Sequence, residues 1–150
     1  MKSIKYRIYK HLNQLLDEKI LEIKQLVSSV RESMDKDTKS SAGDKYETGR
    51  ELMQLEINKH EAQLIKWLEL KAEVSKINLQ KNFTQVGFGS LVKTNRETYF
   101  FSVALGKINI DNETYYLISL ASPIGKSFYE KEKGDSITFR NREYIIENIV

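Results

Sequence analysis

Cysteine is absent from the 150 residues of this chain, and histidine occurs only twice. The lack of cysteine excludes disulfides, thiolate catalysis and cysteine zinc sites, and it suits a reducing compartment such as the cytoplasm. His11 and His60 stand apart, with no triad or metal-spaced cluster around either of them. We therefore expect a cytoplasmic protein without an imidazole-based catalytic site, in which His60 lies between helices with its ring nitrogens hydrogen-bonded.

Long apolar runs are also absent. The opening segment MKSIKYRIYKHLNQLL is interrupted by charges every few positions, so it lacks the apolar core of a signal peptide. No segment is apolar over the thickness of a bilayer. The glycines of VGFGS (86–90) lack the third glycine and the following helix of a phosphate loop, and they predict a bend into a strand. We expect neither export nor a membrane partner.

Neither charge sign is in large excess. The chain has 24 Lys+Arg and 21 Asp+Glu, which gives a formal net charge of +3. Such a surface does not require nucleic acid as a direct partner. The hydrophobic content of 40% is enough for the core of one domain or of two small ones.

The first half of the chain has helical periodicity. Apolar residues recur at alternating intervals of four and three over Leu16–Met34, and the spacing resumes over Tyr46–Val74, where Arg50 and Lys71 occupy two positions of the stripe. The second helix is expected to end near Leu79. Because a short segment joins the helices, we expect an antiparallel hairpin within one chain, and therefore a monomer.

The second half of the chain changes to a period of two. Ser122 can cap and Pro123 can open a short helix between the third and fourth strand-like segments. The expected fold class is therefore α+β: a coiled-coil hairpin over 1–80, then a small antiparallel β domain with one short helix over 81–150. The strand-like segments are SLVKT (90–94), ETYFFSVAL (97–105), ETYYLISL (113–120), SITFR (136–140) and EYIIENIV (143–150), and the expected turns are Asn95-Arg96, Asp111-Asn112, Gly134-Asp135 and Asn141-Arg142.

The segment between the two helices is rich in acids. Helix capping and a solvated turn explain part of this composition. Carboxylates grouped at the end of a hairpin can also hold a hard cation such as Mg²⁺. The residue types alone leave both interpretations open for Asp35, Asp37, Asp44 and Glu47.

The run SPIGKSFYEKEKGDSITFRNREYIIENI (122–149) resembles the C-terminal FKBP-like domain of the Gre family of bacterial transcription elongation factors. A Ser-Pro-Leu/Ile-Gly motif and a later Gly-Asp pair match in order and spacing. On the second helix, a Tyr and an Arg match those that follow the family's hairpin turn. The matching residues are Ser122, Pro123, Ile124, Gly125, Gly134 and Asp135, with Tyr46 and Arg50 on the helix.

The resemblance implies a protein that binds RNA polymerase and meets nucleic acid only through it. The β domain would dock at the rim of the secondary channel through Ser122–Gly125, and the hairpin would reach toward the active centre. In cleavage-stimulating members, two tip acids help to hold the second metal of the polymerase's own active site. The resemblance therefore implies a chain that is not itself an enzyme and has no cofactor beyond a Mg²⁺ shared with the polymerase.

The tip departs from the family's pattern. Aligned on Tyr46, the family's two acids fall on Lys39 and Ala42, while Asp37 and Asp44 stand two residues to either side. A lysine about 4 Å from a divalent ion would repel it by several kcal/mol at an effective dielectric of about 20. We therefore expect a tip that modulates the polymerase, composed of Asp35, Asp37, Lys39, Asp44, Tyr46, Glu47 and Arg50.

Three alternatives remain open. The chain is a transcript-cleavage factor if Asp37 and Asp44 act as metal ligands. It is a coiled-coil interaction module unrelated to polymerase if its β domain binds another protein. The FKBP-like fold also suggests a prolyl isomerase, which we place last because a fold does not confer a function.

Overall fold

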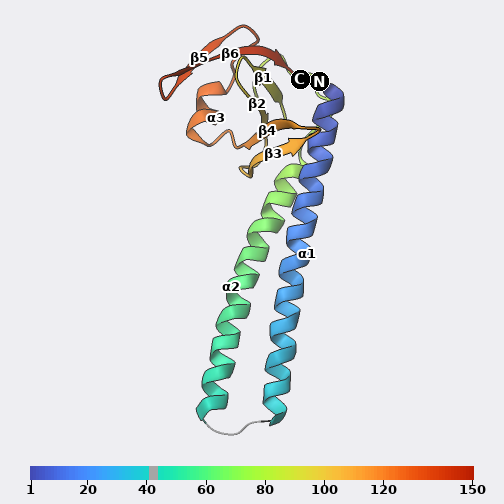
Figure 1. Ribbon diagram of the computed structural model, residues 1–150, viewed down its shortest axis with the longest axis vertical. Helices are drawn as coiled ribbons and strands as arrows, with labels where there is room; N and C mark the ends of the chain where they lie inside the picture. Colours follow the sequence, from blue (N-terminus) through green and yellow to red (C-terminus); the bar gives the residue numbers. More distant parts are fainter. Residues whose placement is uncertain (41–43) are drawn as a thin grey trace. The chain divides into compact units, whose positions relative to one another are not determined.

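The computed structural model describes residues 1–40 and 44–150, with the side chains of 1–36 and 47–150. Two long helices precede a sheet of six strands and a short helix (Figure 1), so the α+β fold class is confirmed. The chain forms two compact units, residues 13–72 and residues 1–12 with 73–150. The elements are α1 (Lys2–Ser40), α2 (Asp44–Ser75), β1 (Leu91–Thr94), β2 (Thr98–Phe101), β3 (Gly106–Ile110), β4 (Glu113–Ile118), α3 (Pro123–Phe128), β5 (Ser136–Phe139) and β6 (Arg142–Ile149).

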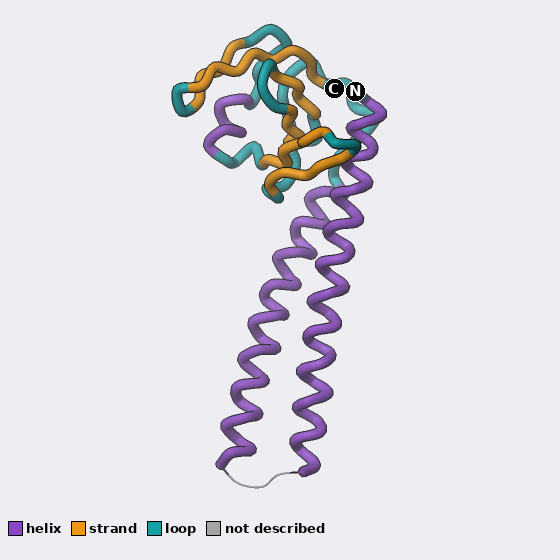
Figure 2. The backbone as a smooth tube through the Cα atoms, viewed as in Figure 1, coloured by secondary structure: helices purple, strands orange, loops and turns teal. Residues whose placement is uncertain are grey.

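Within residues 13–72, α1 and α2 lie side by side as an antiparallel hairpin (Figure 2). The predicted stripe of α1 is buried at Leu16, Ile20, Ile23 and Val27. Its counterpart on α2 is less deeply buried, because only Ile57 among the described apolar residues over 47–72 is fully enclosed. The predicted hairpin is confirmed, and its two helices contribute unequally to the apolar interface.

Helix α2 ends earlier than the periodicity predicts. Its last helical residue is Ser75, and the expected end near Leu79 is wrong. The backbone N–H groups of Lys76 and Ile77 donate to the carbonyls of Glu73 and Val74, each at 3.1 Å. These bonds span three residues instead of four, which tightens the last turn and stops the helix.

The sheet is mixed: four of its five strand pairs are antiparallel, as the predicted antiparallel β domain requires, and one is parallel, which the prediction did not include. The strand order is β3-β4-β2-β1-β6-β5, and β2 pairs with β4 in parallel. The predicted strand over 97–105 ends at Phe101, and the chain leaves β2 to form β3, which the sequence analysis missed. The expected turn at Asp111 and Asn112 joins β3 to β4, and both residues have positive φ, 51° and 65°, as a tight hairpin turn requires.

Aromatic side chains form the core between the sheet and α3. Tyr99, Phe101, Phe128 and Tyr144 are all buried. Their neighbouring ring centroids lie 5.5–6.2 Å apart in tilted or edge-on arrangements, which is the favourable range for aromatic pairs. Most aromatic residues of the second half are thus core residues, as expected, although Tyr129 is 51% exposed.

The first turns of α1 belong to the same compact unit as the sheet, which differs from the predicted division at residue 80. Lys2 Nζ donates to Asn82 Oδ1 at 2.7 Å, and Arg7 forms an ion pair with Asp111. Ile8 and Leu12 are completely buried. A domain boundary in the chain therefore passes through α1 as well as through the end of α2. Over the described residues, no helix combines the length and the apolar character needed to cross a membrane.

Candidate functional site

The predicted docking loop, 121–125, is held by a compact set of hydrogen bonds. Ser122 caps α3: its Oγ accepts from the N–H of Gly125 at 3.1 Å and donates to the carbonyl of Ser119 at 2.6 Å. Pro123 occupies the first turn, where a missing N–H costs nothing. Ser119 Oγ accepts from the N–H of Ala121 at 3.1 Å. The loop is therefore tied to the end of β4 on both sides of the proline.

Gly125 is required by close packing. A Cβ at this position would lie 2.1 Å from the carbonyl oxygen of Ser119 and 2.8 Å from the Cα of Leu120. Backbone atoms cannot move away from such a contact as a flexible side chain can. Glycine therefore allows α3 to begin directly against the end of β4, and its role in the motif is structural.

The loop presents a narrow set of side chains to solvent. Ala121, Pro123 and Lys126 are exposed. Ile124 is half-buried and packs against the aromatic core, and Gly125 is buried. Of the four predicted docking residues, Pro123 is therefore the one that a partner would meet first, while Ser122, Ile124 and Gly125 shape the loop.

The hairpin tip is described only in part. Asp35, Glu47 and Arg50 are exposed. The backbone of Asp37 and Lys39 is in α1, and that of Asp44 and Tyr46 is in α2. The side chains of these four residues, and Ala42 altogether, lie outside the described part of the chain. The predicted Mg²⁺ ligands Asp37 and Asp44 remain a prediction.

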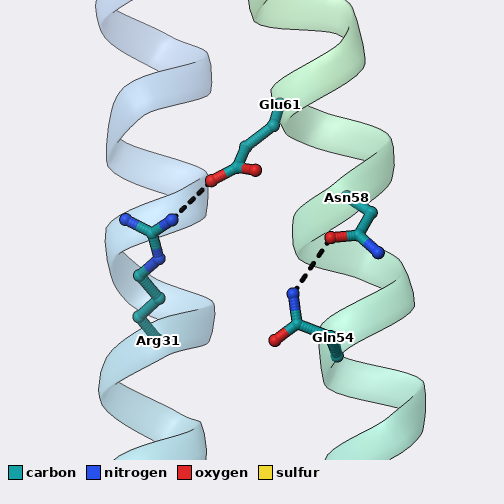
Figure 3. Close-up of polar contacts among 4 residues, drawn as sticks. All are labelled: Arg31, Gln54, Asn58 and Glu61. Atoms are coloured by element: carbon teal, nitrogen blue, oxygen red, sulfur yellow. Dashed lines mark hydrogen bonds and ion pairs between the residues drawn. The ribbon is translucent and has the colours of Figure 1, made fainter.

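Polar contacts link the helices on the way to the tip. Arg31 of α1 forms an ion pair with Glu61 of α2, while Gln54 Nε2 donates to Asn58 Oδ1 at 2.9 Å within α2 (Figure 3). Further from the tip, Lys71 Nζ lies 2.9 Å from Asp17 Oδ1 and 2.7 Å from Asn13 Oδ1. A shallow groove of about 330 Å³ follows the ion pair and is lined by Lys24, Val27, Ser28, Arg31, Glu32, Asp35, Glu61 and Leu64.

His60 lies in the hairpin as predicted. Its side chain is 16% exposed, and its ring nitrogens lie 3.4 Å from Gln63 Oε1 and 3.5 Å from Glu56 Oε1. His11 is exposed. Across residues 1–36 and 47–150, no three His, Asp or Glu side chains gather as metal ligands. The described imidazoles therefore have local partners or solvent around them.

One candidate that the sequence analysis missed is Lys5. The residue is 2% exposed, and its Nζ has no hydrogen-bond partner among the described residues. Burial, together with the positive charges of Lys2 and Lys81, lowers the pKa of Lys5 to about 8. The burial of Lys5 could have been inferred from its position. Lys5 lies three residues before Ile8, where it continues the buried stripe of α1 toward the start of the helix.

A second feature that the sequence analysis missed ties α1 to the β3–β4 turn. The guanidinium of Arg7 binds the carboxylate of Asp111, which lowers the pKa of Asp111 and raises that of Arg7. Nearby, burial and a hydrogen bond to Glu113 raise the pKa of Tyr115 to about 12. Arg7 is paired with Asp111, and Tyr115 is hydrogen-bonded to Glu113. Because these groups are already paired within the chain, we assign both contacts a structural role.

Comparisons with known proteins give a distant likeness among solved structures. No protein-family model and no curated protein sequence matches the chain. Among solved structures, the chain is similar to a structure of the transcription factor Gfh1, with 19% sequence identity and a TM-score of 0.38 over 91% of this chain and 93% of the other.

Proposed function

We propose that this protein is a regulator of transcription elongation that binds bacterial RNA polymerase through its β domain and places its helical hairpin in the secondary channel. The observation that carries the proposal is the Ser-Pro-Ile-Gly loop, which resembles the docking motif of the Gre family. In this chain the motif forms a capped, tightly bonded turn with Pro123 exposed. A rigid loop binds with little loss of conformational entropy, which favours a role in recognition.

The hairpin supports the second part of the proposal. Helix α1 has 39 residues and α2 has 32, and the part of α1 within residues 13–72 corresponds to roughly 40 Å of helix. Ion pairs such as Arg31–Glu61 and Lys71–Asp17 join the two helices along this length. An arm of that reach can carry its tip into a deep channel. The chemistry in this proposal belongs to the polymerase, and the chain itself is not an enzyme.

The test is an arrested bacterial elongation complex to which the purified protein is added. Binding to the polymerase, RNA shortening and RNA extension are followed together. We expect binding and slowed extension without shortening, and relief of the inhibition when residues 39–43 are deleted. Pro123→Asp should weaken binding about tenfold, because it places a charge on the exposed apolar side of the loop.

The matched control is Ala104→Asp, which adds the same charge at another exposed position of the same unit and should bind normally. Brisk RNA shortening that is lost in the Asp37→Ala, Asp44→Ala double variant would instead identify a cleavage factor. If the protein does not bind the polymerase, the proposal is wrong and the interaction-module alternative takes its place.

A further inference from the structure

Three lysine side chains gather where α1 begins. Lys5 Nζ lies 4.5 Å from the ring centroid of Phe83, and Lys81 Nζ lies 4.8 Å from the same centroid. Lys2 Nζ donates to the side-chain oxygen of Asn82. The charges of Lys2 and Lys81 both act on Lys5. The ring of Phe83 provides a weak attraction to the ammonium groups, but it does not neutralise them.

Among the described residues, no carboxylate lies within ion-pair distance of these three lysines. The first turn of α1 contains no acid. The Nζ of Lys5 is enclosed and has no hydrogen-bond partner. A buried ammonium without a partner is unfavourable, and two further ammonium groups nearby increase the cost.

A polar hollow of about 230 Å³ lies next to this cluster. Its lining includes Lys81, Asn82 and Thr84, whose ammonium, side-chain amide and hydroxyl can all donate hydrogen bonds. Lys81 is exposed on a flexible stem. Phe83, whose ring both Lys5 and Lys81 contact, also lines the hollow, so the enclosed ammonium of Lys5 lies one side chain away from it. Glu130 also lines the hollow and disfavours an anion close to it.

We propose that Lys2, Lys5 and Lys81 form a binding site for a small phosphate anion, with Asn82 and Thr84 as additional donors. Lysine binds phosphate as a point charge, and several lysines can share its oxygens. A phosphate with close to two negative charges compensates more of the cluster than a carboxylate does. It also gives the enclosed ammonium of Lys5 the partner that it lacks. This inference is independent of polymerase binding.

The proposal predicts an unusual pH dependence. Lys5 loses its proton near pH 8, whereas an ordinary lysine does so near pH 10.5. The charged groups that act on it are Lys2, from its own helix, and Lys81, from the segment after α2. Phosphate keeps its charge above pH 8, so its affinity should fall between about pH 8 and pH 9.5 because Lys5 becomes neutral. Binding by exposed lysines alone would persist to higher pH.

The experiment measures binding of inorganic phosphate to the full chain by calorimetry and by phosphorus NMR, at constant ionic strength set with chloride. We expect saturable binding that weakens about tenfold in Lys5→Met and in Lys81→Met. Lys81 is exposed, so its variant remains informative if Lys5→Met does not fold. Lys107→Met removes an exposed lysine on β3 and should bind as the unmodified chain does.

A parallel titration with glycerol phosphate distinguishes the free ion from a small phosphate ester, and site-dependent binding of either one supports the proposal. Three outcomes would overturn it: no saturable binding of either ligand, equal affinity in Lys81→Met and Lys107→Met, or an affinity that does not change between pH 8 and pH 9.5.

Discussion

At the residue scale, Lys5 makes the stability of the sheet-bearing unit depend on pH. Its pKa is about 8 in the folded chain and 10.5 as the ordinary value. Between these values the unfolded chain binds more protons than the folded one, so stability rises with pH over this window and is lower at and below pH 8. With about 1.4 kcal/mol per pKa unit, the full effect is about 3 kcal/mol.

Lys5→Met should therefore raise the free energy of unfolding at pH 7 by about 1–3 kcal/mol and remove the rise between pH 8 and pH 10.5, because an apolar side chain of similar length fills the same space. Chemical denaturation in chloride buffers at several pH values measures both effects. Lys107→Met, at an exposed position, should leave the curve unchanged. A destabilised Lys5→Met variant whose stability still rises between pH 8 and pH 10.5 would show that the ammonium of Lys5 is not the source of the pH dependence.

The docking motif shows how far single residues could be predicted. Ser122 and Pro123 indicated a helix start, and both are found there, because capping depends on local chemistry. The burial of Ile124 was not predicted, since a helix of six residues is too short for its apolar face to appear as a period. The close approach of Gly125 to Ser119 depends on tertiary packing.

At the element scale, the polar pair Lys71–Asp17 tests how the hairpin holds its register. Lys71 occupies a stripe position, and its Nζ lies 2.9 Å from Asp17 Oδ1. A double-mutant cycle with Lys71→Met and Asp17→Asn should give a coupling of about 0.5–1 kcal/mol in the free energy of unfolding, because the pair is only partly shielded from water.

The reference for this cycle is Lys19 and Glu22, an exposed pair within α1 at 3.6 Å. Its coupling should be smaller, at most about 0.5 kcal/mol. Equal couplings for the two pairs would mean that Lys71 contributes nothing to the register, and that the apolar stripe alone determines how the helices align.

The elements differ in how well the sequence predicted them. The hairpin helices were predicted because a long stripe repeats its signal many times, as over Leu16–Met34. Strand β3 was missed because Gly106–Ile110 has five residues and a single buried side chain, Ile108. Strand β3 lies between β2 and β4 in the sequence. When β3 is missed, β2 and β4 become consecutive strands, which favours antiparallel pairing, so their parallel pairing could not be predicted either.

At the scale of the whole molecule, the unit boundary depends on side chains that are far apart in the sequence. The contacts Lys2–Asn82 and Arg7–Asp111 bring the first turns of α1 into the unit that contains the sheet. Composition and periodicity report on neighbouring residues only, so they indicated a simple division at residue 80. The same limitation explains why the cluster of Lys2, Lys5 and Lys81 became visible only in the structure.

The packing of the hairpin determines the oligomeric state that we expect. Both apolar stripes of the hairpin are used within one chain, which favours a monomer. Among its described side chains, those of 47–75, helix α2 also exposes four large apolar ones, Leu52, Leu55, Ile65 and Leu68, which are between 43% and 63% accessible. Charged residues are interspersed among them, and scattered exposed leucines are common on monomeric proteins.

We therefore expect one sedimenting species whose mass equals a single chain at micromolar concentration, unchanged by dilution and unchanged in the double variant Leu55→Lys, Ile65→Lys. The two substitutions place charges on the exposed side of α2, where they disturb no buried contact. A dimer that dissociates in this variant would identify the exposed side of α2 as a self-association surface. A dimer that persists in the variant would instead mean that the hairpin stripes pair between chains, and the intramolecular hairpin would then not be the form in solution.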